Sequence, residues 1–201
     1  KRFLRFKIYG GVCFVGTSGT SSASYDSCVV DGKIYVCSNH RISIFDAETL
    51  EYISYFGSYG TDDGKVSFPI SVCSDGQYIY VADYGNHRIQ KFTLDGEFVS
   101  KVGSQGSEDD QFNHPLCVRY YDGKLYICDY SNSRLKVHLA SDLSFIGSHS
   151  IGFCPRACWV DSENNYILVS AWEKIYVYQL SDFQVVRSNR INRYKRNFSK
   201  W

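Results

Sequence analysis

Hydrophobic and polar residues alternate in short runs along most of the chain, and turn-forming sequences separate these runs. The clearest example lies within residues 68–103, where we expect four strands at Ile70–Cys73, Tyr78–Ala82, Arg88–Thr93 and Phe98–Val102. Asp-Gly pairs and a Tyr-Gly-Asn sequence stand between the runs. β-Branched and aromatic residues bounded by such turns are typical of antiparallel hairpins. The stretch therefore predicts a four-stranded meander.

The same pattern recurs with a period of about 45 residues. The copies share a tyrosine in the second strand, a proline ahead of the first strand and a glycine that ends the copy. These positions are Tyr35, Tyr80 and Tyr126; Pro69, Pro115 and Pro155; and Gly57, Gly103 and Gly147. A more divergent fourth copy has Ser170 in the place of Asp83 and Lys174 in the place of Arg88. Repeated four-stranded meanders predict an all-β propeller, in which each blade buries its faces against its neighbours.

The repeats also predict the boundaries of the blades. We expect blades at 17–57, 58–103, 104–147 and 148–186, and a basic extension at 187–201. Residues 1–16 align with the last two strands of a further blade, which brings the count to about four and a half. The chain starts at Lys1 and contains no Met. We therefore expect a segment of a longer polypeptide and a larger or six-bladed ring, with atypical closure of a smaller ring as the alternative.

The central copy resembles the NHL-repeat family. The shared features are a proline before the first strand, the sequence IYVAD at 79–83, the sequence GNHRIQ at 85–90 and the closing glycine. The resemblance is strong over about 57–147 and weaker on either side. It implies a β-propeller of four-stranded antiparallel blades, most often six in a ring. Some NHL propellers attached to ubiquitin-ligase modules resemble RNA-binding platforms, and others resemble lyases that hold a metal in the central channel.

The distribution of charge narrows the choice of partner. The net charge is +1, but residues 1–7 carry four basic groups and residues 187–201 carry six, which leaves 12 basic against 21 acidic residues between them. An acidic body disfavours phosphate backbones, which bind mainly to Lys and Arg. The candidates for contact with an anionic partner are Arg187, Arg190, Arg193, Lys195 and Arg196. A solvated extension is the alternative interpretation of this end, and the absence of an 18-residue apolar run predicts no membrane span.

The eight cysteines favour reduced, structural thiols. Cys37 and Cys128 share the repeat position of Ala82, a small residue at a position of buried type, where cysteine acts as a compact hydrophobe. Four more lie in or beside the first strand of successive copies, at Cys28, Cys73, Cys117 and Cys158. Cys154 and Cys158 lack a second pair at zinc spacing, so we expect neither a metal nor another cofactor. Reduced thiols without a signal peptide favour a cytoplasmic location.

Opposite charges flank the predicted turn between the second and third strands of two copies. These pairs are Asp83 with Arg88 and Asp129 with Arg134. A catalytic residue is expected to be unique, whereas these residues recur with the repeat, so we interpret them as structural ion pairs. The five histidines are scattered, and no nucleophile elbow or phosphate-binding loop is present. We therefore predict a protein that is not an enzyme and has no small-molecule substrate.

Propellers bind partners through the loops of one face, which here are the linkers 57–68, 103–114 and 147–154 and the turns beside them. Aromatic and arginine side chains are typical of binding hot spots. The candidates for partner binding are Tyr59, Tyr84, His87, Arg88, Tyr130, Arg134 and Trp172. We predict a non-catalytic scaffold for protein–protein interaction. The alternatives are an RNA-binding platform, disfavoured by acidic linkers, and a lyase-like, metal-dependent propeller enzyme.

Overall fold

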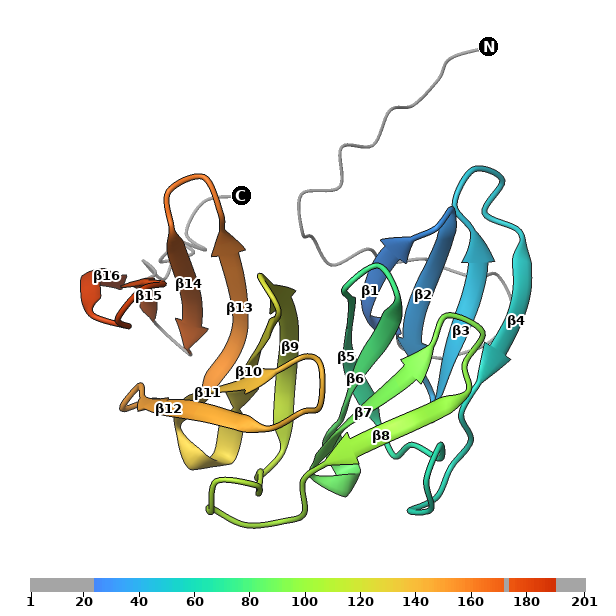
Figure 1. Ribbon diagram of the computed structural model, residues 1–201, viewed down its shortest axis with the longest axis horizontal. Coiled ribbons are helices and arrows are strands. Elements are labelled where there is room, and N and C mark those ends of the chain that lie inside the picture. The colour runs from blue at the N-terminus through green and yellow to red at the C-terminus, as the bar shows by residue number, and fades with distance from the viewer. Residues whose placement is uncertain (1–23, 172–173, 191–201) are drawn as a thin grey trace, which may run out of the picture.

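The computed structural model describes residues 24–171 and 174–190, and the described residues form four antiparallel sheets (Figure 1). The first sheet contains β1 (Ser24–Val30), β2 (Lys33–Ser38), β3 (Arg41–Asp46) and β4 (Tyr52–Phe56), and the second β5 (Pro69–Ser74), β6 (Tyr78–Asp83), β7 (Arg88–Thr93) and β8 (Phe98–Val102). The third contains β9 (Pro115–Tyr121), β10 (Lys124–Asp129), β11 (Arg134–Leu139) and β12 (Phe145–Ser150), and the fourth β13 (Pro155–Asp161), β14 (Tyr166–Ala171), β15 (Lys174–Gln179) and β16 (Val185–Arg190). Short 3-10 turns, η1 (Tyr84–Asn86) and η2 (Tyr130–Asn132), join the middle strands of the second and third sheets. The half blade predicted at 1–16 lies outside the described residues.

Each sheet is one blade, and the blades follow one another around an open arc (Figure 1). Strands β1, β5, β9 and β13 lie innermost, and each contacts the innermost strand of the next blade. The sheets do not close into a ring. The prediction of an all-β fold with propeller blades is confirmed.

The middle strands are buried because neighbouring blades cover both of their faces. Residues 79–83 of β6 and 125–129 of β10 are all buried, whereas β8 alternates between exposed and half-buried positions. In the first two blades, the recurring tyrosine joins the blade to the next one. The Tyr35 hydroxyl donates to the carbonyl of Leu94 (2.9 Å), and the Tyr80 hydroxyl donates to that of Ala140 (2.9 Å).

A second repeated contact joins the innermost strands. A side chain in each strand accepts a hydrogen bond from a backbone N–H of the next blade, and its chemistry changes from carboxylate to hydroxyl to thiol. The pairs are Asp26 Oδ2 with Val72 N (3.2 Å), Ser71 Oγ with Val118 N (3.1 Å) and Cys117 Sγ with Cys158 N (3.5 Å). Arg119 strengthens the first two by donating to Asp26 Oδ2 (2.8 Å) and Ser71 Oγ (2.9 Å). Buried polar groups thereby fix the spacing of the blades.

Two predicted blade ends are wrong. β12 continues through Gly147 to Ser150, so the linker to β13 contains only residues 151–154. Gly147 pairs with Val137 inside the strand, with open space around it, and is not a copy-ending glycine like Gly103. In the last blade, residues 187–190 belong to β16 and not to an extension. An outermost strand pairs on one side through its backbone, so it forms without strong apolar alternation.

Candidate binding face and axial pocket

A buried carboxylate holds η1 to the linker that precedes its blade. Asp83 is fully buried and accepts hydrogen bonds from Ser67 N (2.7 Å), Asn86 Nδ2 (2.9 Å) and Arg88 Nε (2.8 Å). Gln90 Nε2 is a fourth donor at 3.0 Å. Burial raises the pKa of Asp83, whereas the four donors favour its ionised form. The carboxylate therefore fixes the turn, strand β7 and the linker together.

Arg88 binds the rest of the linker 57–68. Its Nη1 donates to the carbonyl of Thr61 (2.8 Å), and its Nη2 donates to those of Asp62 (2.9 Å) and Lys65 (2.7 Å). Asn86 donates to the carbonyl of Gly60 (2.8 Å). The predicted ion pair is thus present, but the Arg88 side chain is only 6% exposed. The fold itself uses the guanidinium, so little of it is accessible to a partner.

The third blade repeats this clamp on the linker 103–114. Asp129 accepts from Asn113 N (2.7 Å), Asn132 Nδ2 (2.8 Å) and Arg134 Nε (2.7 Å). The linker carbonyls that Arg134 binds are those of Ser107, Glu108 and Gln111. The Arg134 side chain is 15% exposed, so it too acts mainly within the fold. Lys136 takes the place of Gln90 and donates to linker carbonyls as well.

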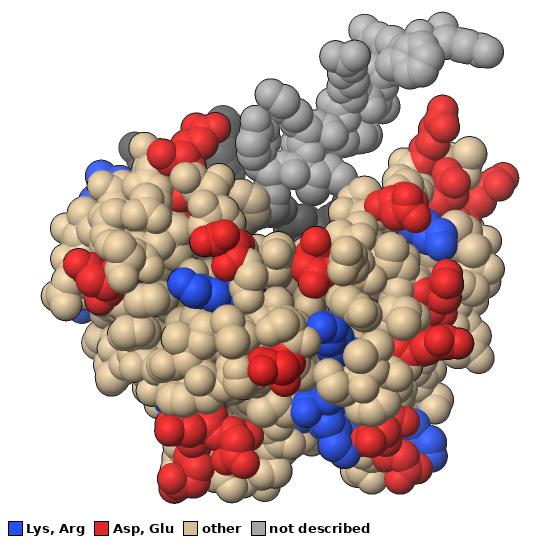
Figure 2. Space-filling model, in the orientation of Figure 1, with Lys and Arg blue, Asp and Glu red and all other residues tan. Residues whose placement is uncertain are grey.

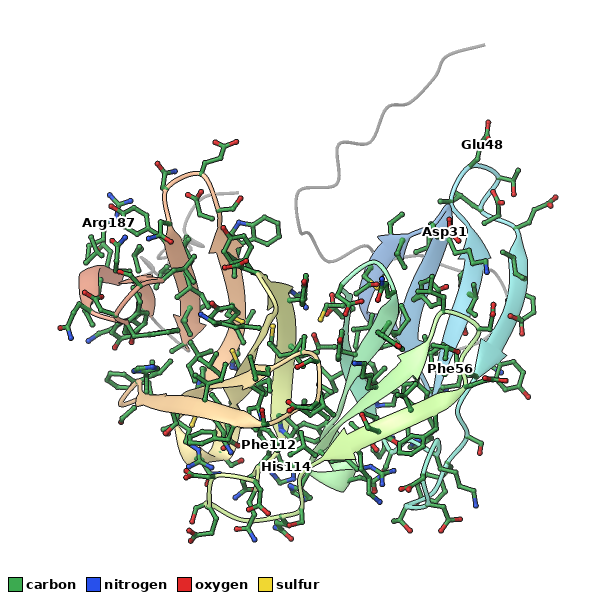
Figure 3. All side chains as sticks on the ribbon, viewed as in Figure 1. Asp31, Glu48, Phe56, Phe112, His114 and Arg187 are labelled. Carbon is green, nitrogen blue, oxygen red and sulfur yellow. The ribbon has the colours of Figure 1, made fainter. Side chains whose placement is uncertain are left out.

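Histidines of the turns hold the last residue of the linker that leads to the following blade. Phe68 N donates to His40 Nδ1 (3.1 Å), and His114 N donates to His87 Nδ1 (3.1 Å). Phe68 and His114 have positive φ angles of 48° and 59°, which are uncommon for residues with side chains. The ring acceptors help to hold this backbone. Figure 3 shows His114 beside Phe112 at the lower end of the arc.

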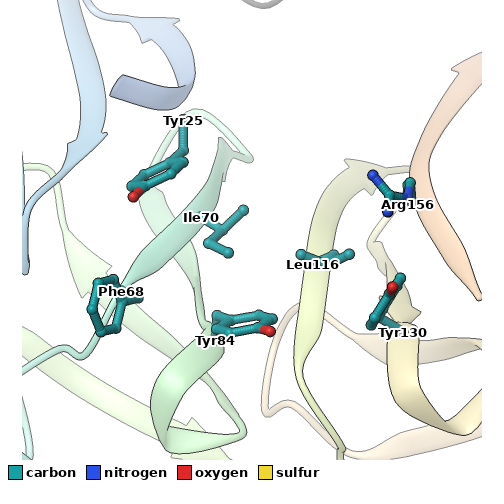
Figure 4. A pocket seen from close by; sticks show the side chains of 7 residues that line it. All are labelled: Tyr25, Phe68, Ile70, Tyr84, Leu116, Tyr130 and Arg156. Carbon is teal, nitrogen blue, oxygen red and sulfur yellow. The ribbon is translucent and has the colours of Figure 1, made fainter. Parts of the chain in front are cut away.

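An apolar pocket of about 350 Å³ lies beside the two turns, along the innermost strands (Figure 4). The residues that line it are Tyr25, Phe68, Ile70, Tyr84, Leu116, Tyr130 and Arg156. The guanidinium of Arg156 lies 5.8 Å from the centre of the Tyr130 ring, a cation–π contact. Aromatic walls with one cation suit a ligand that combines an apolar group with a negative charge.

Carboxylates gather on the linkers around this face. The linker 57–68 carries Asp62 and Asp63, and the linker 103–114 carries Glu108, Asp109 and Asp110. Figure 2 shows acidic groups at the lower edge of the molecule, where Figure 1 places the two linkers. Lysines offset part of this charge, since Lys65 pairs with Asp62 and Lys101 with Asp63. The rim of the face is therefore more negative than the pocket.

The other predicted contact residues lie at different places. Tyr84 and Tyr130 both line the pocket. Tyr59 is 71% exposed on its linker and meets the His40 ring edge-on at 4.8 Å. His87 is half-buried, and its ring packs on that of His114 at 4.3 Å.

The predicted contacts for an anionic partner are only partly described. Arg187 is exposed on β16, far from the pocket-lining strands, and Arg190 ends that strand. Arg193, Lys195 and Arg196 lie outside the described residues, as does Trp172.

Sequence reasoning missed five pocket residues, namely Tyr25, Phe68, Ile70, Leu116 and Arg156. The last three each follow a recurring proline. An alignment of the repeats would have shown that the residue after this proline is apolar in two copies and is an arginine in the last copy. It also missed that Ala171, and not Ser170, takes the place of Asp83, because Ala171 pairs with Lys174 as Asp83 pairs with Arg88.

Comparisons with known proteins agree with this architecture. Residues 67–92, which span β5 to β7, match the family model of the NHL repeat. No curated protein sequence matched the chain. Within the described residues, no helix is long and apolar enough to cross a membrane.

Several solved β-propeller structures are similar to the chain. Hydrazine synthase of Kuenenia stuttgartiensis matches with a TM-score of 0.68 and 11% identity, over 90% of this chain and 53% of that one. U3-55K matches with a TM-score of 0.64 and 15% identity, over 84% and 52%. Glutaminyl cyclase of Myxococcus xanthus matches with 0.56 and 14%, over 82% and 69%. The chain spans about half the length of the first two, and at these identities the likeness shows the fold alone.

Proposed function

We propose that this chain, an NHL-repeat protein folded into β-propeller blades, is a binding module that recognises a segment of a protein partner in which one carboxylate neighbours an apolar side chain. The observation that carries the proposal is the pocket beside η1 and η2, with tyrosines on its walls and Arg156 at its edge. We infer that an apolar side chain of the partner enters the pocket, while a neighbouring carboxylate meets the guanidinium.

The rigidity of the face favours binding. Asp83 and Asp129 each bind their turn to a linker, so the tyrosines that follow them, Tyr84 and Tyr130, are held before a partner arrives. A preorganised site loses little conformational entropy on binding. Tyrosine also buries a large area with few rotatable bonds, which makes it a frequent hot-spot residue. These features support a scaffold role for the module.

Two observations support protein binding over the alternatives. The linker carboxylates would repel a nucleic-acid backbone, which is negative at every phosphate, more strongly than a peptide with one carboxylate beside Arg156, even though tyrosines can stack on bases. The described residues that line the pocket include no carboxylate, histidine or cysteine that could act as a general base. Because the similar structures include enzymes, activity has to be tested directly.

A peptide selection tests the proposal. The 201-residue chain is used to select from a random peptide library, and the selected peptides are measured by fluorescence polarisation. We expect peptides that combine Asp or Glu with an aromatic or aliphatic residue. Arg156→Leu, which copies Leu116 of the preceding blade, should weaken their binding about tenfold or more. Lys124→Leu, at the end of β10 opposite to η2, is the control and should leave it unchanged.

Three results would count against this function. Peptides without acidic residues, or equal binding by the Arg156 variant, would remove the assigned role of the pocket. A mobility shift with single-stranded RNA that falls steeply between low and moderate salt would favour the RNA-binding alternative instead.

We also propose a reducing, cytoplasmic setting. The seven described cysteines are free thiols, and five of them are buried. Thiol counting after unfolding of protein purified from its native cells, with alkylation at lysis, should find all eight cysteines reduced. Disulfides in that sample would contradict this location.

A further inference from the structure

Three cysteines from three different strands meet at the boundary between the third and fourth blades. They are Cys117 in β9, Cys128 in β10 and Cys158 in β13, and all three are buried. Their sulfur atoms lie within 4.8 Å of one another, with 3.8 Å between those of Cys117 and Cys158. They come together because Cys128 pairs with Cys117 across the sheet, while Cys158 lies on the adjoining innermost strand.

The other blade boundaries show that packing alone does not require this set. At the boundary between the second and third blades, the register places Ser71, Ala82 and Val118 at the corresponding positions. At the boundary between the first and second blades, Asp26, Cys37 and Val72 correspond. Among the described boundaries, only the third has sulfur at all three positions. The three sulfurs form a compact set of soft metal ligands.

The cluster is held by hydrogen bonds at the blade boundary. The Sγ atoms of Cys117 and Cys158 lie 3.8 Å apart, and Cys158 Sγ donates to the carbonyl of Tyr126 at 3.6 Å. The thiolate is the form of cysteine that binds metals, so metal binding has to release the thiol protons.

We propose that Cys117, Cys128 and Cys158 form a site for one thiophilic metal ion of the Zn²⁺ and Cu⁺ class, which joins the third and fourth blades. Zinc–thiolate bonds of about 2.3 Å at tetrahedral angles would place two sulfurs about 3.8 Å apart. The Sγ atoms of Cys117 and Cys158 are 3.8 Å apart, and all three sulfurs lie within 4.8 Å of one another. An all-sulfur set selects soft ions against Mg²⁺ and Ca²⁺. On binding, three metal–sulfur bonds form and the three thiol protons leave to solvent.

Metal binding by the reduced 201-residue chain tests this site. Zn²⁺ and Cu⁺ are added separately without oxygen, excess metal is removed by dialysis against a weak chelator, and bound metal is measured by elemental analysis. We expect about one equivalent of at least one of the two ions and a higher melting temperature with the metal than without it. The two arms identify which ion of the class binds.

The repeat supplies variants that should still fold. The triple variant Cys117→Ser, Cys128→Ala, Cys158→Val gives this boundary the residues found between the second and third blades. It should bind no equivalent of metal, and adding metal should not raise its melting temperature. Cys158→Val alone should weaken binding while changing less of the core. Cys37→Ala removes the cysteine that corresponds to Cys128 in the first blade and should change neither readout. Failure of the parent chain to bind either ion, or equal binding by the triple variant, would overturn the proposal.

Discussion

Replacing Arg88 by methionine tests whether the charged clamp, and not the length of the side chain, holds the linker 57–68. The substitution keeps an unbranched side chain but removes the guanidinium. Asp83 would then remain fully buried with three neutral donors, and the carbonyls of Thr61 and Asp62 would lose their Arg88 donors. Removing one partner of a buried ion pair costs about 3–5 kcal/mol. We expect the lower part of this range, because the Lys65 carbonyl keeps its hydrogen bond from Gln90 (2.7 Å).

Arg134→Met is the matched comparison in the next blade. Its side chain is 15% exposed against 6% for Arg88, so water can replace more of its hydrogen bonds. We expect a cost of about 1–3 kcal/mol, typical of losing hydrogen bonds to a charged group. The structure thus predicts an order between two variants with the same chemistry.

Urea unfolding followed by circular dichroism measures both costs. The midpoint should fall in each variant while the slope stays unchanged, since the same surface is exposed on unfolding. Adding Asp83→Asn to Arg88→Met should recover part of the loss, because the unpaired buried charge is removed. A loss below about 1 kcal/mol for Arg88→Met, or a larger loss for Arg134→Met, would refute this reasoning.

Three further predictions concern other parts of the fold. His138, buried with its Nε2 lacking a partner among the described residues, has a pKa lowered mainly by burial. The unfolded chain therefore takes up a proton below about pH 6.5 that the folded chain takes up only at lower pH, and stability falls there by up to about 1.4 kcal/mol per pH unit. His138→Phe, which copies Phe92, should flatten that fall in urea midpoints measured from pH 5 to 8. Gly103→Ala should destabilise by about 1–3 kcal/mol in the same assay, because φ is +120° and a Cβ would lie 2.7 Å from the His87 carbonyl, whereas Gly147→Ala should be close to neutral. Asp26→Asn should lower the melting temperature by weakening the acceptor shared by Ser71, Val72 and Arg119, at a cost of about 1.5–3 kcal/mol, and no change in calorimetry would contradict that role.

Local patterns predicted the strands of the second blade closely. Arg88–Thr93 and Phe98–Val102 have the predicted bounds, and Ile70–Cys73 falls short by one residue at each end. Asp-Gly and Tyr-Gly-Asn are short-range turn signals, and alternating side chains determine which residues pair across a hairpin. Both kinds of information lie within a few residues of the strand that they predict.

The missed features depend on contacts between blades. Gly147 stands in a strand that is extended only because β11 continues to pair with it. Arg156 enters the pocket from β13, while Tyr25 reaches it from β1. The sequence around Arg156 or Tyr25 does not reveal that these side chains line one pocket, because packing between blades sets the positions of the innermost strands. The repeat register is the sequence feature that could have revealed them.

The clamps and the long linkers occur together, and this explains where the charged pairs are found. Twelve-residue linkers, 57–68 and 103–114, precede the two blades that carry an aspartate and an arginine at the turn. The four-residue linker 151–154 precedes a blade in which Ala171 replaces the aspartate. A short linker leaves few carbonyls for an arginine to bind, and a buried aspartate without those partners would cost stability. The aspartate–arginine pairs therefore occur where a long linker has to be held in place. The same linkers form the rim of the proposed binding face.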